Sequence, residues 1–308
     1  MNKNIFKNSV SGLVIALIVC ALWGSLFPVV KLGYSALGIS ESSIPSIILF
    51  AGSRFVICGI VLIAMTLTKS KGADIPRGRG FAGICLVALV TIILHYSFTY
   101  IALSVGDGGK SAIIKQVGFL FLSCFAFLFD KSDRFTVRKM ISAILGFAGI
   151  IVTNLDSSGF SFDLGDFLLV LASLCSCLGM VLTKKITKTV SPVVLVAYSQ
   201  FIGGIFLLVC GIVAGGSVAY LTLKGVLIFA YICTASILAY VLWNVLVKYN
   251  DLSKLSVIKF TEPLFAVIFS GIILGENIFR LSYLGAFIII FVSVLVMNYR
   301  GKECGTDE

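Results

Sequence analysis

A lysine and a glutamate stand close together in an apolar run near the end of the chain. Lys259 directly precedes the stretch FTEPLFAVIFSGIILGE, in which Glu262 is the third residue. On a helix, residues three apart share a face and can form an ion pair. Ionisable side chains among apolar residues are costly unless they face water or a polar partner. We therefore expect both to line a solvated cavity, and a self-neutralised pair inside a packed helix kink fits the same spacing.

The residue after this glutamate, Pro263, cannot donate the hydrogen bond that continues a helix. Proline also crowds the carbonyl four residues back, which belongs to Lys259. A carbonyl released among apolar groups needs water or another polar partner. We expect a bend at Pro263 that turns the Lys259 carbonyl and the Glu262 side chain toward the cavity. Pro28, in the first apolar run, is a second hinge candidate.

Four polar residues in other apolar runs could face the same cavity. Lys115 and Gln116 lie in IIKQVGFLF, with Lys115 about seven residues, or ~10 Å of helix rise, inside its run. Cavity lining and snorkelling toward the surface both fit that depth. Arg54 stands near the middle of its run and could be a hydrogen-bond hub or a ligand contact. Gln200 holds the corresponding place in a later run.

A histidine and several aromatic residues also lie well inside apolar runs. His95 is the only histidine of the chain and could bridge two helices or relay a proton. Tyr96 follows it, and Tyr240 stands at a similar place in a later run, with Trp243 and Asn244 next to it. Aromatic residues at membrane interfaces occur at helix ends, whereas these are several residues inside. We take all five as cavity candidates.

The motifs of common catalytic sites are missing from this sequence. It contains no HExxH, no GxSxG and no Walker loop. Eight of the nine cysteines stand in apolar runs, and Cys175 and Cys177 lack the CxxC spacing of a zinc site. We therefore expect no enzyme activity, no metal site, no cofactor and no disulfide framework.

The composition of this chain indicates that it lies in a lipid bilayer rather than in water. Of its 308 residues, 59% are hydrophobic and 12% are charged, about half the charged share of soluble domains. The net charge of +10 then reflects basic loops beside a lipid bilayer rather than nucleic-acid binding. Apolar windows cover residues 10–34, 44–67, 80–103, 108–129, 140–155, 164–187, 192–214, 224–247, 252–275 and 281–299. Because single spans in lipid must be helical, we predict an all-α integral membrane protein with ten transmembrane helices.

Basic residues predict the orientation of these helices. If the N-terminus is cytoplasmic, the inner segments contain nearly all lysines and arginines outside the apolar runs, and the outer segments contain only Lys224 and Arg280. The positive-inside rule then places both termini in the cytoplasm and the loop near Ser158 outside, in a multi-pass protein of the cell membrane.

Weak internal similarity divides the chain into two halves. AGSRFVICG at 51–59 matches AYSQFIGGI at 197–205, and IIKQVGFLF at 113–121 matches VIKFTEPLF at 257–265. We predict two five-helix repeats, 1–157 and 158–308. Five is odd, so the second repeat enters the membrane inverted, which is typical of secondary transporters that work by alternating access.

These motifs resemble the EamA-type branch of the drug/metabolite transporter superfamily. ALWGSLFPVVKLG is similar to the family's first-helix motif at Trp23, Gly24, Phe27 and Lys31, Arg54 matches its second-helix arginine, and EPLFAVIFSGIILGE is similar to its ninth-helix pattern at Glu262, Pro263, Gly275 and Glu276. The fourth run lacks the proline that the family often has there. The resemblance covers nearly the whole chain and implies transport of small metabolites, and it adds Trp23 to the cavity candidates. We expect Glu276 to be a structural cap of the last helix.

We expect a secondary transporter, and an exporter rather than an importer, for a small metabolite such as an amino acid. Arg54, Lys115 and Lys259 outweigh Glu262, which favours a substrate with a carboxylate. A lipid-carrier flippase and a non-transporting membrane scaffold are the alternatives. The lipid bilayer is the expected surrounding, no nucleic acid is expected, and a homodimer is compatible with the sequence.

Overall fold

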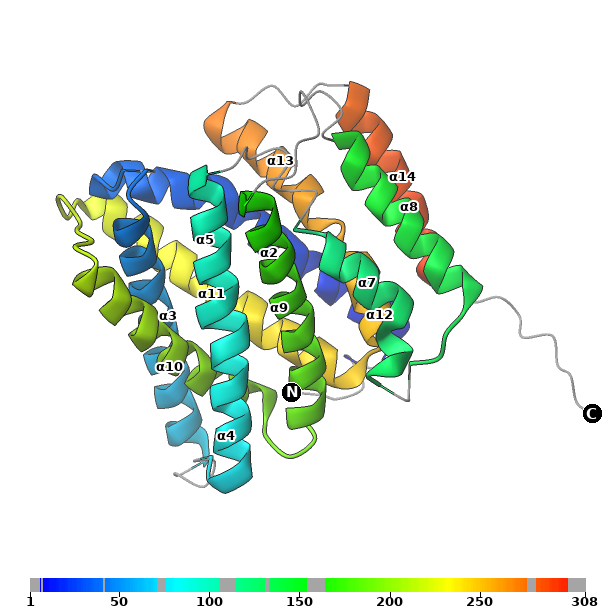
Figure 1. Cartoon of the computed structure of the whole chain (residues 1–308), viewed down its shortest axis with the longest axis horizontal. Helices are drawn as coiled ribbons and strands as arrows, with labels where there is room; N and C mark the ends of the chain where they lie inside the picture. Colours follow the sequence, from blue (N-terminus) through cyan, green and yellow to red (C-terminus); the bar gives the residue numbers. More distant parts are fainter. Residues whose placement is uncertain are drawn as a thin grey trace, which may run out of the picture.

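The computed structural model describes residues 6, 8–40, 42–70, 76–105, 115–130, 133–153, 164–275 and 281–298. Within these residues the regular structure is entirely helical (Figure 1). The predicted all-α fold class is therefore confirmed. Glu276 and the predicted boundary between residues 157 and 158 lie outside the described residues.

Ten apolar helical segments follow one another along the described chain, close to the ten predicted windows. They are α2 (Ser9–Leu37), α3 (Ile44–Ser70), the continuous α4 (Gly78–Val87), η1 (Ala88–Leu94) and α5 (His95–Val105), α7 (Val117–Phe125) with the short η2 (Ala126–Leu128), α8 (Val137–Thr153), α9 (Leu164–Ile186), α10 (Pro192–Val213), α11 (Leu223–Tyr249), α12 (Leu252–Lys259) with α13 (Glu262–Leu274), and α14 (Leu281–Asn298). Seven are long and apolar enough to cross a membrane, and Val117–Leu128 and Leu284–Met297 are shorter apolar helices.

The first five and the last five segments make equivalent contacts with each other. α3 packs against α10, and α8 packs against α14, so the second and the fifth segments of the two sets meet each other. α2 packs against α11 and α13, and α9 packs in the same way against α5 and α7. In Figure 1 the α8–α14 pair forms one edge of the molecule and the α3–α10 pair the other. This pattern is the one that two repeats in pseudo-twofold relation produce.

Glycines bring α3 and α10 together. A Cβ atom on Gly59 would stand 2.6 Å from the backbone nitrogen of Phe201, and one on Gly204 would stand 2.6 Å from that of Val56. Only glycine leaves room for such backbone contact, which is the usual way that small residues join helices in membranes. The α3–α10 pair is therefore a firm structural unit.

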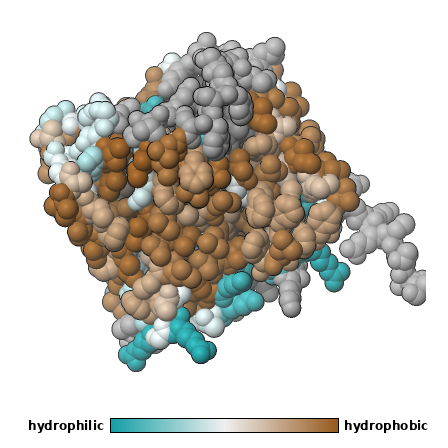
Figure 2. Space-filling view, viewed as in Figure 1, coloured by the Kyte–Doolittle hydropathy of each residue, from teal (hydrophilic) through white to brown (hydrophobic). Residues whose placement is uncertain are grey.

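The outer surface of the helices is largely apolar, as a surface in contact with lipid must be. Large apolar side chains face outward in the middle of several helices, among them Ile18, Phe206 and Phe291, with exposed fractions of 50%, 50% and 64%. Figure 2 shows such residues across most of one face, while hydrophilic residues gather along the lower edge, where α4 begins and α9 ends. Arg77 and Lys188 are exposed at this end, which we call the basic end.

Two segments change their helical course near the middle of the molecule, and the described helix of a third begins there. η1 is a π-helical stretch in the third segment, and π-helical stretches often accompany functional sites. α7 starts directly after a turn at 115–116, and a turn at 260–261 separates α12 from α13. The bend that we predicted at Pro263 is therefore a complete break, and Pro263 stands in the first turn of a new helix, where proline fits. Pro28 lies inside the continuous α2, and its hinge role stays a prediction.

Candidate functional site

A cavity of about 140 Å³ lies between the inner faces of α9, α10, α11 and the third segment, beside the two turns. Of the predicted site residues, those that line it are Trp23, His95, Tyr96, Lys115, Gln116, Gln200, Tyr240, Trp243, Asn244, Lys259 and Glu262. These residues come from six of the ten segments, and α9 adds a seventh through Ser173 and Ser176. Their grouping agrees with the expected polar cavity.

Arg54 is the exception among the predicted residues, since it does not line this cavity. It is buried, with an exposed fraction of 6%, and its guanidinium carbon lies 4.3 Å from the ring centre of Phe55 and 5.5 Å from that of Tyr96. Among the described residues, its Nε and Nη2 atoms have no hydrogen-bond partner. Arg54 therefore stands behind the cavity wall, where it contacts the far side of a lining tyrosine.

Aromatic rings surround the ammonium group of Lys259. Its Nζ atom lies 3.3 Å from the ring centre of Trp23, 5.1 Å from that of Trp243 and 5.9 Å from that of Phe119. It also forms an ion pair with Glu262. The two explanations of the Lys259–Glu262 spacing are thus both met in part, because the pair is neutralised and also lines the cavity.

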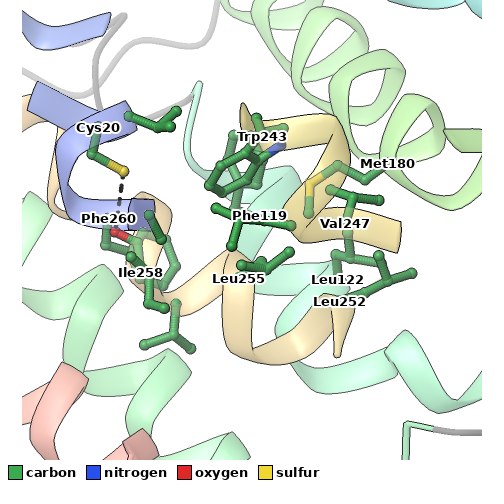
Figure 3. Close-up of a cluster of buried hydrophobic side chains, with 14 of the residues drawn as sticks. Cys20, Phe119, Leu122, Met180, Trp243, Val247, Leu252, Leu255, Ile258 and Phe260 are labelled. Carbon is green, nitrogen blue, oxygen red and sulfur yellow. Dashed lines mark hydrogen bonds between the residues drawn. The ribbon is translucent and has the colours of Figure 1, made fainter. Parts of the chain in front are cut away.

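Hydrogen bonds at the 260–261 turn converge on the carbonyl of Ile258. The Thr261 hydroxyl donates to it at 2.8 Å and the Thr261 amide at 3.0 Å. The Cys20 thiol of α2 lies 3.7 Å from the same oxygen, the dashed contact in Figure 3. We had expected the Lys259 carbonyl to be the polar acceptor at this break. The structure shows a tight turn in which the preceding carbonyl, that of Ile258, is an acceptor, and the orientation of the Lys259 carbonyl toward the cavity stays a prediction.

Ser173 of α9 holds the other break. Its hydroxyl donates to the carbonyl of Lys115 at 2.7 Å and accepts from the amide of Gly118 at 2.8 Å. A Cβ atom on Gly118 would lie 2.6 Å from the Ser173 hydroxyl oxygen, so this position requires glycine. α7 therefore begins at a turn held by α9, at a place where this chain lacks the proline that the family often has. α9 thus contacts the turn at 115–116 through Ser173, as α2 contacts the turn at 260–261 through Cys20.

Lys115 has surroundings that differ from those of Lys259. Alignment of IIKQVGFLF with VIKFTEPLF places Gly118 opposite Glu262, so the first half has no acid at this point. Lys115 is half-buried, its ammonium lies 5.9 Å from the ring centre of Phe27, and it has no carboxylate partner among the described residues. Two lysines against one glutamate leave the cavity one net positive charge, located at Lys115.

Two glutamines add unused hydrogen-bonding groups to the cavity wall. Gln116 and Gln200 have exposed fractions of 6% and 1%. The Oε1 atom of Gln116 and both amide atoms of Gln200 have no partner among the residues that the structure describes. An unsatisfied buried polar atom costs about 1–3 kcal/mol. These groups are therefore available to water or to a ligand.

Helices of the two sets meet at a pair of tyrosines. The Tyr96 and Tyr240 hydroxyls lie 2.8 Å apart, 144 positions apart in the chain, and Asn244 donates to the Tyr240 carbonyl at 2.8 Å. Nδ1 of His95 donates to the carbonyl of Ala172 at 2.8 Å. This bond joins α5 to α9, as expected for an interhelical histidine. It leaves Nε2 for the cavity.

Several hydroxyl groups line the cavity that sequence reasoning did not single out. They are Thr91, Ser173, Ser176, Thr183 and Ser199. Three of them lie on α9 with spacings of three and seven residues, which is one helix face. That stripe was the signal that could have identified them.

The cavity is displaced toward the basic end of the molecule. On α9 its lining runs from Ser173 to Thr183, in the half that ends in basic residues, and on α10 it is confined to 196–200, near that helix's start. Toward the other end, the Tyr34, Phe50 and Phe229 rings stack edge to face, with ring centres 5.2 and 5.1 Å apart. This aromatic cluster packs α2, α3 and α11 together beyond the cavity.

Comparison with known proteins shows which family and which relatives this chain is similar to. The model of the EamA-like transporter family matches the chain twice, over 10–155 and 163–299. The uncharacterized transporter YvbV of Bacillus subtilis is 30% identical over 91% of this chain and 89% of that protein, and the uncharacterized inner membrane transporter YedA of Escherichia coli is 26% identical over 89% and 87%.

One solved crystal structure of a protein superposes on this chain with a TM-score of 0.79. It covers 96% of this chain and 99% of its own at 19% identity, which shows a shared fold. The two family matches, the relatives named as transporters and the helical architecture agree with one another. The chain is a multi-pass membrane protein of the EamA-like transporter family.

Proposed function

We propose that this protein is a secondary transporter that exports a small organic acid across the cytoplasmic membrane, and that it is not an enzyme. The observation that carries the proposal is Lys115. Among the described residues its charge has no carboxylate partner, it faces a cavity at membrane depth, and an anionic group on a substrate would offset the cost of that charge. Gln116 and Gln200 offer hydrogen bonds beside it.

The position of the cavity supports export as the direction of transport. With both termini in the cytoplasm, as the basic loops favour, the basic end is cytoplasmic. The cavity then lies toward the cytoplasm, and the aromatic cluster of Tyr34, Phe50 and Phe229 covers the outer side. A substrate would load from inside, and an exchange of conformation between the two halves would release it outside.

The proposal is tested by measuring the Tm of the purified protein in the presence of small organic acids and of their neutral amides. Each small organic acid is compared with its own neutral amide, so that only the charge differs. A ligand at 100 times its Kd adds about 2.7 kcal/mol to stability. We expect acids to raise the Tm more than their amides do, and Lys115→Met to abolish the difference.

The matched control is Lys188→Met, which removes an exposed lysine far from the cavity. It should keep the wild-type response. The proposal fails if amides stabilise the protein as well as acids do, or if Lys115→Met responds like the wild type.

A further inference from the structure

The surroundings of Lys259 have the chemistry of an ammonium-binding site. Three rings lie within 6 Å of its Nζ atom, and the carboxylate of Glu262 pairs with it. Aromatic cages of this kind bind alkylammonium ligands through the negative faces of the rings. Here the occupant is a side chain of the protein itself.

Within the part of the first half that the structure describes, Lys115 has no such site. Lys115 has one ring at 5.9 Å, and glycine stands where the second half has Glu262. The cage is therefore not a general consequence of the repeat. It surrounds the lysine of the second half, with Trp23 and Phe119 contributed by the first half, and it lies in the wall of the same cavity as Lys115.

We propose that Trp23, Trp243 and Glu262 form a binding site for an alkylammonium group, which Lys259 occupies as a tethered ligand and so closes to free amines. The proposal deepens the proposed function, because it assigns the selectivity of the same cavity. With Lys259 in place, an amine meets a neutralised glutamate and a filled cage. An acid still meets the unpaired Lys115.

Removal of the tethered ligand should open the site. Lys259→Ala keeps Cβ and deletes three carbons and the ammonium group, which together have the shape of propylammonium. Lys259→Met fills the space out to the position of Cε and leaves room for ammonium. Each variant thus has its own matching amine, so the test survives if one of them fails to fold.

Tryptophan fluorescence reports on the site directly. The chain has two tryptophans, Trp23 and Trp243, and both contact the Lys259 ammonium. Full-length protein in detergent is titrated with propylammonium chloride, and 1-propanol serves as the neutral probe. We expect a saturable change in Lys259→Ala with an affinity at least about tenfold above that of the wild type, and no response to 1-propanol.

Two further variants define the site. Glu262→Gln added to Lys259→Ala should lower the affinity for propylammonium at least about tenfold, because the carboxylate is lost. Lys115→Ala removes the same atoms from the other lysine and should create no amine site. For Lys259→Met, ammonium chloride should give the saturable change.

The proposal is overturned if the folded Lys259 variants do not respond to their amines, or if the wild type or Lys115→Ala responds as strongly. Its failure is separate from failure of the proposed function. The latter is measured as the response of the wild type to organic acids, and the former as the response of the Lys259 variants to amines.

Discussion

Lys115 and Lys259 occupy matching positions in the two halves, yet their neighbours differ. Lys259 is paired with Glu262 and enclosed by rings, whereas Lys115 reaches the cavity beside Gly118. A buried ion pair loses its reactivity toward outside ions, while an unpaired charge keeps it. The charge available to a substrate is therefore that of Lys115.

His95 gives a prediction at this scale. Its Nδ1 donates to the carbonyl of Ala172 between α5 and α9. Asparagine can place a donor where Nδ1 stands but cannot relay a proton. His95→Asn should therefore keep both stability and transport, while His95→Leu should lower the free energy of unfolding by about 0.5–1.5 kcal/mol, because one hydrogen bond between α5 and α9 is lost.

Denaturation of the purified protein and flux in liposomes measure the two quantities. A His95→Asn variant that folds normally but has lost transport would show that the histidine carries protons rather than joining helices.

The charged, amide and histidine side chains of the lining could be found from the sequence because such side chains are conspicuous in an apolar run. Arg54 was predicted to line the cavity, but it does not. Its depth in the membrane can be read from the sequence, whereas the direction of its side chain depends on the packing of α3 against α10. The hydroxyls were missed for another reason. Thr91 bonds the Val87 carbonyl of its own helix at 2.8 Å, so such residues are ordinary in membrane helices.

At the scale of elements, two breaks position the site. α7 and α13 both begin next to a cavity lysine, and a small polar residue from the first helix of the opposite half contacts each break: Ser173 from α9 and Cys20 from α2. Positions of the helices could be predicted from apolar length alone. The first break could not, because a contact 58 residues away in sequence makes it.

Gly118→Ala tests the fit at this break. A Cβ atom at 118 would meet the Ser173 hydroxyl at 2.6 Å and its carbonyl oxygen at 2.7 Å. Overpacking of this kind costs about 1–3 kcal/mol, so the Tm should fall. The control is Gly285→Ala in α14, where the nearest atom lies at 3.7 Å. Equal Tm values for the two variants would contradict the tight contact.

Asp251 gives a pH-dependent prediction at the start of α12. It lies between two membrane-spanning segments, and burial, followed by the charge of Asp133, raises its pKa above the ordinary aspartate value. The folded state therefore holds this proton more tightly than the unfolded chain does. The aspartate costs stability as the pH rises through its folded-state pKa.

Asp251→Asn removes that cost and keeps a favourable N-cap residue. Its Tm should equal that of the wild type at a pH below the ordinary aspartate range and exceed it at neutral pH. A difference in Tm that stays constant across pH, or a lower Tm of the variant at neutral pH, would show that the raised pKa has no effect on folding.

On the scale of the whole molecule, the contact pattern survives exchange of the halves, but the cavity does not lie symmetrically. It extends toward the basic end, and the cluster of Tyr34, Phe50 and Phe229 packs the other end. Two inverted halves can adopt each other's conformation, and the same residues would then face the other side. Ser176, which lines the cavity, should be reachable from both faces of the membrane over time.

Labelling of one cavity cysteine from each side measures this directly. In a cysteine-free background, Ser176→Cys is treated with a membrane-impermeant maleimide in intact cells and in inside-out vesicles, with cysteines at Gly72 and Ser158 as markers of the two sides. We expect Ser176→Cys to react from both sides, faster from the cytoplasmic side, while Gly72→Cys reacts only from inside and Ser158→Cys only from outside. A Ser176→Cys that is reached from one side alone, however long the exposure, would contradict alternating access.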